Sequence, residues 1–268
     1  MSTPAATWVF DLGNSRLKGA WLDEGSLAQP VALPWGTVGF DAALDAHLQR
    51  WPPAHRILVA SVVAASRADR VRATLQAWPR AHQQWLRSPR QACGITNAYR
   101  VPERLGIDRF LAMAAARGAA GQAGVVVIGC GTALTLDAVD ANGVQQQGLI
   151  APSPELMLRG LRGATAIDRT NPKAFEPDET DDTARALRQG CERAASALVA
   201  WYDARQRAGG EDPALWLHGG GSAALRDSLD DEIAMRARLL EDAVLRGLAL
   251  WAACGNTGTD SQSAAPPE

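Results

Sequence analysis

The sequence predicts an α/β protein made of two similar halves. Each half opens with three successive strands and continues with helices that alternate with further strands. A glycine turn joins the first two strands of each half, in DLGNSRLK at residues 11–18 and in GCGTALTLD at residues 129–137. We place the two domains at residues 1–118 and 119–254, followed by a polar tail at residues 255–268 that is expected to be disordered.

The composition is that of a globular protein with a full core. The chain has 268 residues, of which 47% are hydrophobic, and its net charge of −2 makes bulk attraction to nucleic acid unexpected. No apolar run is long enough to span a bilayer, and MSTPAATW at the start lacks the basic and apolar regions of a signal peptide. The four cysteines have no metal-site or redox spacing, which favours free thiols in a reducing cytosol.

Hydrophobic patterning predicts the elements of the first half. The apolar run Trp8–Phe10 and the alternating stretch Leu17–Trp21 indicate two strands around the first turn, where glycine and asparagine tolerate the positive φ of a hairpin. Further strands are expected at 27–33, 56–61 and 82–86, and helices at 40–51 and 66–78. Ser66 and Asp69 have the spacing of a capping box, which predicts a helix start at Ser66.

The second half is predicted in the same way. Strands are expected at 124–130, 134–139, 144–150 and 214–218, and helices from residue 154 onward, at 181–206 and at 232–253. Ser153 stands at the N-cap position of the helix that starts at Pro154, and proline is favoured at a first helical position. Three glycines at 219–221 form a loose turn after the strand at 214–218.

Asp11 lies where the first strand ends, beside the first glycine turn. Backbone N–H groups in such a turn can cradle an anion, and a carboxylate can hold Mg²⁺ directly or through water. Lys18, on the following strand, would lie along a polyphosphate. Taken alone, this stretch slightly favours an ordinary hairpin with a solvated lysine.

The second turn and a helix between the halves offer further candidate groups. Gly131 and Thr132 present N–H groups and a hydroxyl to a phosphate, although a tight meander of strands explains them as well. A helix is expected at 107–117 with Asp108 in its first turn, where the helix dipole favours a charged carboxylate. Such a carboxylate can accept a proton from a substrate hydroxyl, and a capping aspartate paired with Arg109 is the alternative.

Five stretches, taken together and in order, resemble the type III pantothenate kinases of the acetate and sugar kinase/Hsp70/actin superfamily. They are DLGNSRLK, YRVPERLGIDR, GCGTALTLD, GLIAPSPELMLRGL and TARALRQG. The resemblance covers nearly the whole chain except the tail. It implies two ribonuclease-H-like (actin-like ATPase) lobes, each a mixed βββαβα unit, with the active site in the cleft between them.

The resemblance also implies an activity. Members of this family transfer the γ-phosphate of ATP to the hydroxyl of pantothenate, giving 4′-phosphopantothenate in the first step of coenzyme A biosynthesis. They use Mg²⁺ and a monovalent cation, K⁺ or NH₄⁺, and are usually cytoplasmic homodimers. This chain is therefore expected to be an ATP-dependent phosphotransferase that acts on pantothenate, without nucleic-acid or membrane partners.

Matching the motifs residue by residue assigns expected roles. Asp108 matches the catalytic aspartate of the family, and Asp11 is expected to bind Mg²⁺. The positions matched to ATP and phosphate binding are Asp11, Leu12, Gly13, Asn14, Ser15, Arg16, Leu17, Lys18, Gly131 and Thr132. The positions matched to pantothenate binding are Tyr99, Gly106, Ile107, Asp108, Arg109 and Thr183.

Four positions depart from the family pattern. Gly129 stands where members often have an aspartate linked to the monovalent cation, and glycine has no side chain to coordinate one. We therefore expect weak or absent activation by K⁺ or NH₄⁺, or cation ligands that come from elsewhere. Gln147 and Ser153 replace glycines, and His218 replaces a threonine that precedes paired glycines. These changes indicate a shifted site or a weakened activity.

Two other functions remain open at the level of sequence. Some proteins that resemble this family are accessory factors for transcription, but a protein without enzyme activity has no physical need to retain Asp11, Lys18, Asp108, Arg109 and Thr132. A sugar or acetate kinase of the same superfamily is the other alternative. The GIDR element and the short chain favour pantothenate, again by resemblance.

Overall fold

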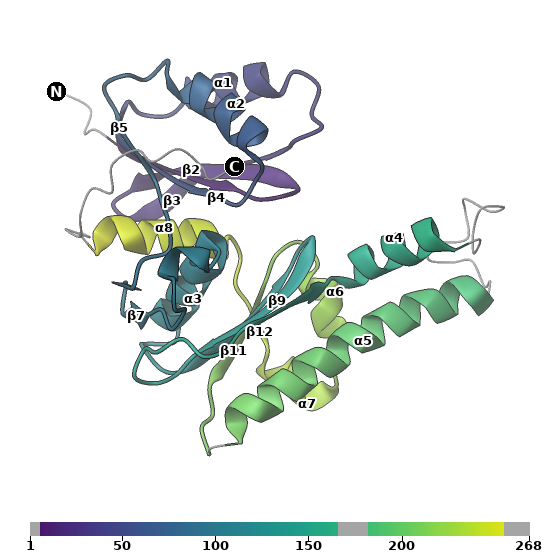
Figure 1. Ribbon diagram of the computed structural model, residues 1–268. Helices are drawn as coiled ribbons and strands as arrows, with labels where there is room; N and C mark the ends of the chain where they lie inside the picture. Colours follow the sequence, from purple (N-terminus) through teal and green to yellow (C-terminus); the bar gives the residue numbers. More distant parts are fainter. Residues whose placement is uncertain (1–5, 166–181, 209, 255–268) are drawn as a thin grey trace. The chain divides into compact units, whose positions relative to one another are not determined.

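The computed structural model describes residues 6–165, 182–208 and 210–254. The chain divides into two compact units, one formed by Met1–Ala115 with Ala243–Glu268 and the other by Ala116–Asp242. Each unit contains a five-stranded sheet (Figure 1). The tail expected at 255–268 lies outside the described residues. No helix in the described part of the chain is long and apolar enough to cross a membrane.

The sheet of the first unit has the strand order β3-β2-β1-β4-β5. Its strands are β1 (Ala6–Leu12), β2 (Arg16–Asp23), β3 (Ser26–Pro34), β4 (Ala54–Ser61) and β5 (His82–Trp85). β1 runs antiparallel to β2 and parallel to β4. Helices α1 (Phe40–Leu48) and α2 (Ala65–Leu75) cover one face of this sheet, and α8 (Ala243–Ala253) covers the other (Figure 1).

The central strand β1 is buried on both faces. Trp8, Phe10 and Leu12 lie in one core cluster with Leu44 of α1 and Leu75 of α2. Val9 is also buried, and successive strand residues point to opposite faces, so Val9 faces the side that α8 covers. Burial on both sides explains why the strand is apolar at the consecutive residues 8–10 rather than alternating.

The capping box predicted for α2 is wrong. The helix begins at Ala65, one residue before Ser66, and no side chain caps it. The Asp69 carboxylate pairs instead with Arg72, three residues along the helix, at 2.5 Å.

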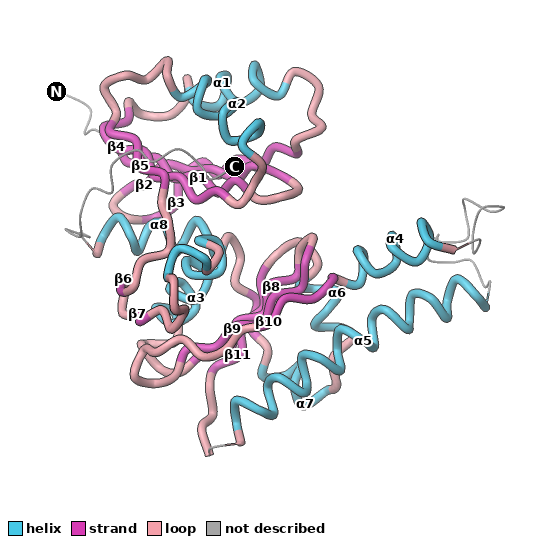
Figure 2. Tube along the Cα trace, in the orientation of Figure 1, coloured by secondary structure: helices cyan, strands magenta, loops and turns pink. Residues whose placement is uncertain are grey.

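A short hairpin that the sequence did not predict follows β5. It consists of β6 (Gln91–Ala92) and β7 (Ile95–Thr96), and the chain then leads through a 3₁₀ turn to α3 (Ile107–Ala119) (Figure 2).

The second unit repeats the topology of the first, with the order β10-β9-β8-β11-β12. Its strands are β8 (Val125–Cys130), β9 (Ala133–Val139), β10 (Leu149–Pro152), β11 (Ala214–His218) and β12 (Arg238–Leu239). Helices α5 (Asp182–Arg207) and α6 (Ser222–Asp227) bury Val199 and Leu225 against this sheet, and α4 (Pro154–Ala164) runs along α5 (Figure 1). The predicted α/β protein of two similar units is confirmed.

Helix α4 begins as predicted, but the strand before it does not. Ser153 caps α4 by accepting a hydrogen bond from Leu156 N at 3.3 Å. The strand predicted at 144–150 begins only at Leu149. The Asp140 carboxylate accepts a hydrogen bond from Val144 N at 2.8 Å, and Gln145 makes an isolated antiparallel bridge with Val139, so residues 144–148 form a turn and a bridge rather than a continuous strand.

The helix predicted at 232–253 is wrong, because the structure divides it. Helix α7 (Asp231–Arg236) ends early, and the short strand β12 then extends the sheet beside β11. Leu240 N donates to Leu217 O at 2.8 Å, which holds the chain in this extended path. Helix α8 packs in the first unit, where Trp251 meets Phe110 edge to face at 6.3 Å. The predicted domain 119–254 therefore differs from the second unit by this last helix.

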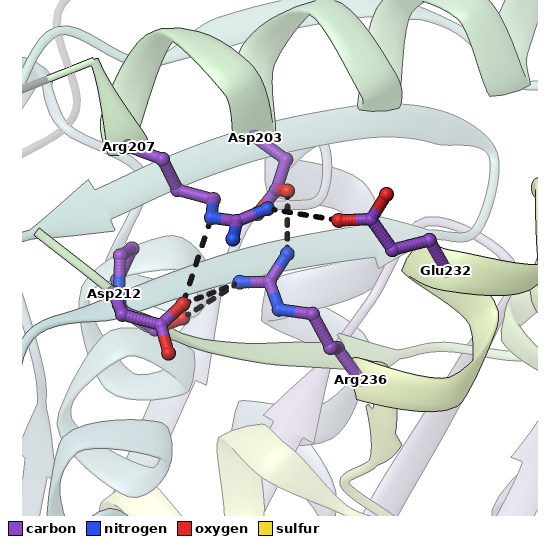
Figure 3. A network of polar contacts seen from close by, with 6 residues as sticks. Asp203, Arg207, Asp212, Glu232 and Arg236 are labelled. Carbon is purple, nitrogen blue, oxygen red and sulfur yellow. Dashed lines mark hydrogen bonds and ion pairs between the residues drawn. The ribbon is translucent and has the colours of Figure 1, made fainter. Parts of the chain in front are cut away.

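A network of ion pairs ties α5 to α7 in the second unit (Figure 3). Arg236 donates to Asp203 Oδ2 at 2.7 Å and to Asp212 Oδ1 at 3.3 Å. Arg207 pairs with the same Asp212 at 3.6 Å and with Glu232 at 3.4 Å. Asp203 is buried whereas Asp212 and Glu232 are exposed, so water screens the Arg236–Asp203 pair least.

Candidate active site

The hairpin between β1 and β2 places two charged side chains on one face. Asp11 lies directly opposite Lys18 in the antiparallel register, and Leu12 lies opposite Leu17. Partners in an antiparallel ladder project to the same face, so the Asp11 carboxylate and the Lys18 ammonium share one face while both leucines are buried on the other. This face can present a metal-binding carboxylate and a cation to a polyphosphate.

The tip of this hairpin is open to solvent. Gly13 N donates to Arg16 O at 3.1 Å, which makes Asn14 and Ser15 the two-residue tip. Both tip residues are exposed. The residues predicted to bind phosphate at 11–18 therefore form one continuous strand–turn–strand, in which β1 runs one residue beyond Asp11.

The segment predicted to bind the substrate, residues 99–109, is anchored by two side chains that precede it. Arg90 Nη1 donates to the carbonyl oxygens of Asn97 and Tyr99, each at 2.7 Å. The buried Asn97 amide donates to Pro102 O at 3.0 Å and its Oδ1 accepts from Tyr99 N at 3.0 Å. A buried amide is stable only when hydrogen-bonded, so these contacts define the path of the segment. The sequence analysis missed both Arg90 and Asn97, which stand outside the matched motif.

Asp108 lies in the first turn of α3, between Gly106 and Arg109. Its Oδ1 accepts a hydrogen bond from Arg109 N at 2.8 Å. A Cβ built on Gly106 would lie 2.6 Å from the same Oδ1, so glycine leaves the carboxylate its place. Arg109 is only 7% exposed, and its guanidinium donates to the Tyr99 hydroxyl at 3.2 Å. The first unit thus brings these four predicted residues together, while the Ile107 side chain is buried in its core.

The hairpin between β8 and β9 is held by the start of α4. Gly131 N donates to Ala133 O at 2.9 Å, which closes the turn around Thr132. The Ser153 hydroxyl donates to Thr132 O at 3.0 Å, so the N-cap of α4 also anchors this turn. The sequence identifies Ser153 as an N-cap, but its contact with Thr132 joins two segments that are separate in the sequence.

Thr183 is the other residue of this unit that the sequence predicts to bind the substrate. It is exposed at the start of α5.

Gly129 and His218 are register partners in the parallel ladder between β8 and β11. A Cβ built on Gly129 would lie 2.5 Å from Thr135 Oγ1 and 2.9 Å from His218 Nε2. Both distances are shorter than real Cβ contacts, so no side chain fits at residue 129 in this arrangement. The imidazole of His218 instead lies at the carboxyl ends of the two parallel strands, close to the second turn.

Comparison with known proteins decides the family. The family model of type III pantothenate kinase matches residues 8–203. The chain belongs to the type III pantothenate kinase family. A type III pantothenate kinase of Xylella fastidiosa (strain M23) is 40% identical over 250 residues, which are 92% of this chain and 97% of that protein. Another from Xanthomonas axonopodis pv. citri is 40% identical over 253 residues, 93% of this chain and 98% of that protein.

Solved structures with little sequence identity share the fold. A Campylobacter jejuni protein of the Baf family of transcriptional activators is similar with a TM-score of 0.54 at 18% identity, covering 90% of this chain and 94% of that one. Component A of (R)-2-hydroxyglutaryl-CoA dehydratase from Acidaminococcus fermentans gives 0.53 at 16% identity, covering 92% and 96%. At such identities the likeness concerns the fold, and the expected two-lobed, ribonuclease-H-like architecture of the type III pantothenate kinases is confirmed.

Proposed function

We propose that this chain phosphorylates pantothenate with ATP, giving 4′-phosphopantothenate in the first step of coenzyme A biosynthesis. Membership of the type III pantothenate kinase family carries the proposal, since relatives of that name are 40% identical over 92% of the chain. The retained charged groups support it: Asp11 and Lys18 share a face of the first hairpin, and Asp108 lies beside Arg109, whose guanidinium donates to the Tyr99 hydroxyl.

Asp108 is the catalytic residue in this proposal. Its carboxylate would accept the proton of the pantothenate hydroxyl as the phosphoryl group is transferred. The hydrogen bond from Arg109 N at 2.8 Å and the position in the first turn of α3 both favour the ionised carboxylate. Pantothenate would bind to Tyr99, Gly106, Ile107, Asp108, Arg109 and Thr183.

The two hairpins would bind ATP. The transition state of phosphoryl transfer is loose, so positioning and charge neutralisation supply most of the catalysis. Lys18 and the N–H groups of residues 11–18 would face the phosphates, and Gly131 with Thr132 would offer N–H groups and a hydroxyl. Asp11 fits as a Mg²⁺ ligand, because carboxylate oxygens are donors that Mg²⁺ prefers. When bound, Mg²⁺ would neutralise charge on the β- and γ-phosphate oxygens.

A monovalent cation held by residue 129 does not fit this chain. Gly129 supplies no side-chain ligand, and the space where a side chain would start is occupied by Thr135 Oγ1 and His218 Nε2. We therefore propose that turnover depends weakly or not at all on K⁺ or NH₄⁺.

The enzyme is further proposed to be a cytoplasmic homodimer. Family resemblance is the main support. Large apolar side chains are also exposed on the second unit, at Ile150 on β10 and at Trp201 on α5. A partner subunit that bound to this unit would cover them. Sedimentation velocity tests this, because a monomer at micromolar concentration contradicts the dimer.

The decisive experiment is phosphorylation of pantothenate by the purified protein with Mg-ATP. Product is followed by mass spectrometry as 4′-phosphopantothenate, in parallel with ADP release, in Na⁺, K⁺ and NH₄⁺ buffers of equal ionic strength. We expect product at ordinary enzymatic rates in all three. ATP binding without product under any cation would contradict the kinase and favour the regulatory alternative. A steep rise in rate with K⁺ would contradict the proposal for residue 129.

A further inference from the structure

Two side chains from outside the β1–β2 hairpin hydrogen-bond to its carbonyl groups. Trp35 Nε1 donates to Gly13 O at 2.8 Å. Arg67 Nη1 donates to Asn14 O at 2.7 Å. The backbone N–H of Trp35 also donates to Ser15 O at 3.4 Å. Trp35 and Arg67 thus donate hydrogen bonds to three successive carbonyl oxygens at the hairpin tip.

These contacts orient the N–H groups of the tip. In a planar trans peptide unit, the C=O and N–H bonds point in opposite directions. Binding of the Gly13 carbonyl by Trp35 therefore directs Asn14 N–H away from Trp35. Binding of the Asn14 carbonyl by Arg67 directs Ser15 N–H away from Arg67. A turn whose successive N–H groups are oriented in advance is a suitable site for an anion, because no reorganisation is needed when the anion binds.

The two donors are themselves held in place. The Trp35 ring stacks on Phe40 with a centroid distance of 5.1 Å and an interplanar angle of 28°. Phe40 is buried in the core of the first unit. The Arg67 guanidinium lies 5.4 Å from the centroid of the Trp35 ring, within cation–π range. The hairpin tip is therefore connected through Trp35 to the core, although its own residues are exposed.

We propose that Trp35 and Arg67 are positioning residues of the ATP site. They hold the first hairpin so that the N–H groups of Asn14 and Ser15 meet the phosphates of ATP. This rests on the proposed function, because the anion is taken to be the polyphosphate of ATP. Neither residue belongs to a motif that the sequence analysis matched, and Trp35 is one of nine scattered tryptophans.

Two substitutions separate the hydrogen bonds from the packing. Trp35→Phe keeps an aromatic ring on Phe40 but removes the Nε1–H donor. Arg67→Met keeps an unbranched apolar stem but removes the guanidinium. Each variant is expected to bind Mg-ADP about fivefold more weakly or worse by isothermal titration calorimetry, which is the scale of one lost hydrogen bond. The KM for ATP should rise in step, while the KM for pantothenate stays near the wild-type value.

Arg70→Met is the matched control. Arg70 lies on the same helix, one turn further on, but its guanidinium pairs with Asp41 at 2.6 Å and lies over the Phe40 ring at 4.6 Å. This variant is expected to bind Mg-ADP like the wild type. Equal weakening in Arg70→Met and Arg67→Met would overturn the inference, because a general loss of positive charge on α2 would then explain both.

Hydrogen exchange of the ligand-free protein tests the positioning directly. The peptide covering residues 11–18 should exchange faster in Trp35→Phe and Arg67→Met than in the wild type and Arg70→Met, with the thermal midpoint nearly unchanged. Unchanged exchange and unchanged ADP affinity in the two variants would overturn the inference. Failure of the wild type to bind ADP would count against the proposed function instead, and the exchange measurement would still decide whether the two side chains hold the hairpin.

Discussion

The imidazole of His218 lies against Gly129, with its Nε2 atom 2.9 Å from the position that a Cβ at residue 129 would take. The two residues are register partners in neighbouring parallel strands. An acidic side chain at residue 129 and a histidine at residue 218 therefore compete for one space. The departures from the family pattern at these two positions are best understood as one structural change.

This relationship predicts that substitutions at the two positions are not additive. Gly129→Asp is expected to lower the free energy of unfolding by about 1–3 kcal/mol, because it overpacks a filled space. Adding His218→Thr should recover part of that loss, since the competing ring is then absent while Thr135 Oγ1 still lies 2.5 Å from the built Cβ. Urea unfolding of the wild type, both single variants and the double variant measures the coupling. Losses that simply add would show that the imidazole does not occupy this space.

Asp108→Asn is expected to preserve folding and Mg-ADP binding but to lower kcat by about 100-fold or more, because the amide cannot accept the proton of the substrate hydroxyl. Steady-state kinetics with pantothenate measure the loss, and calorimetry with Mg-ADP is the control. Near wild-type turnover would remove Asp108 from the chemistry.

Gly106→Ala tests whether the position of the Asp108 carboxylate matters, because it leaves Asp108 itself unchanged. The new Cβ would lie 2.6 Å from Asp108 Oδ1, so the carboxylate must move. We expect kcat to fall about tenfold or more, since small displacements of a reacting group are costly, with little change in ADP affinity. Gly160→Ala on α4 is the control, because nothing lies within 4 Å of its Cβ and alanine favours a helix. Equal activity of the two variants would contradict this account.

The ion-pair network of the second unit predicts unequal costs for two arginines. Arg236→Met leaves the Asp203 carboxylate, 3% exposed, without its partner at 2.7 Å, and is expected to destabilise the protein by about 3–5 kcal/mol. Arg226→Met removes a pair with Asp227 that is 3.9 Å long and largely exposed, and should cost less than about 1 kcal/mol. Urea unfolding compares them, and similar midpoints would refute the distinction.

The cysteines are expected to differ in reactivity at neutral pH. Burial raises the pKa of Cys130 to about 11. Burial, and then a hydrogen bond with the Cys254 thiol, raises the pKa of Cys93 to about 12. Because the thiolate is the reactive form, both should react with iodoacetamide more than about 100-fold slower at pH 7.5 than an unperturbed cysteine. Their rates should rise as the pH approaches these pKa values.

Peptide mass spectrometry after timed alkylation of the native protein measures these rates. The exposed Cys254 is expected to be labelled first. Labelling of Cys130 as fast as Cys254 would contradict the burial of that thiol.

Features that depend on neighbouring residues could be predicted from the sequence. The β1–β2 hairpin follows from an apolar run, a short polar turn and an alternating strand, although neither Gly13 nor Asn14 takes the positive φ that was expected there. Ser153 with Pro154 correctly predicts the start of α4. The succession of strands along the chain in the two halves, apart from β12, was predictable for the same reason, since strand periodicity and turn residues are local signals. The motif residues of the candidate site lie in such segments.

Features that depend on long-range contacts could not be predicted. The helix expected at 232–253 is divided because Arg238–Leu239 gains a place in the sheet beside β11, a contact that helical periodicity does not reveal. Three further contacts join segments that are far apart in the sequence. They are the hydrogen bond from Trp35 to Gly13 O, the hydrogen bond from Ser153 to Thr132 O, and the close approach of His218 to residue 129. Local patterning therefore specified most of the elements and where the phosphate hairpins lie, whereas packing of distant segments decided the short strands β6, β7 and β12 and how those hairpins are held.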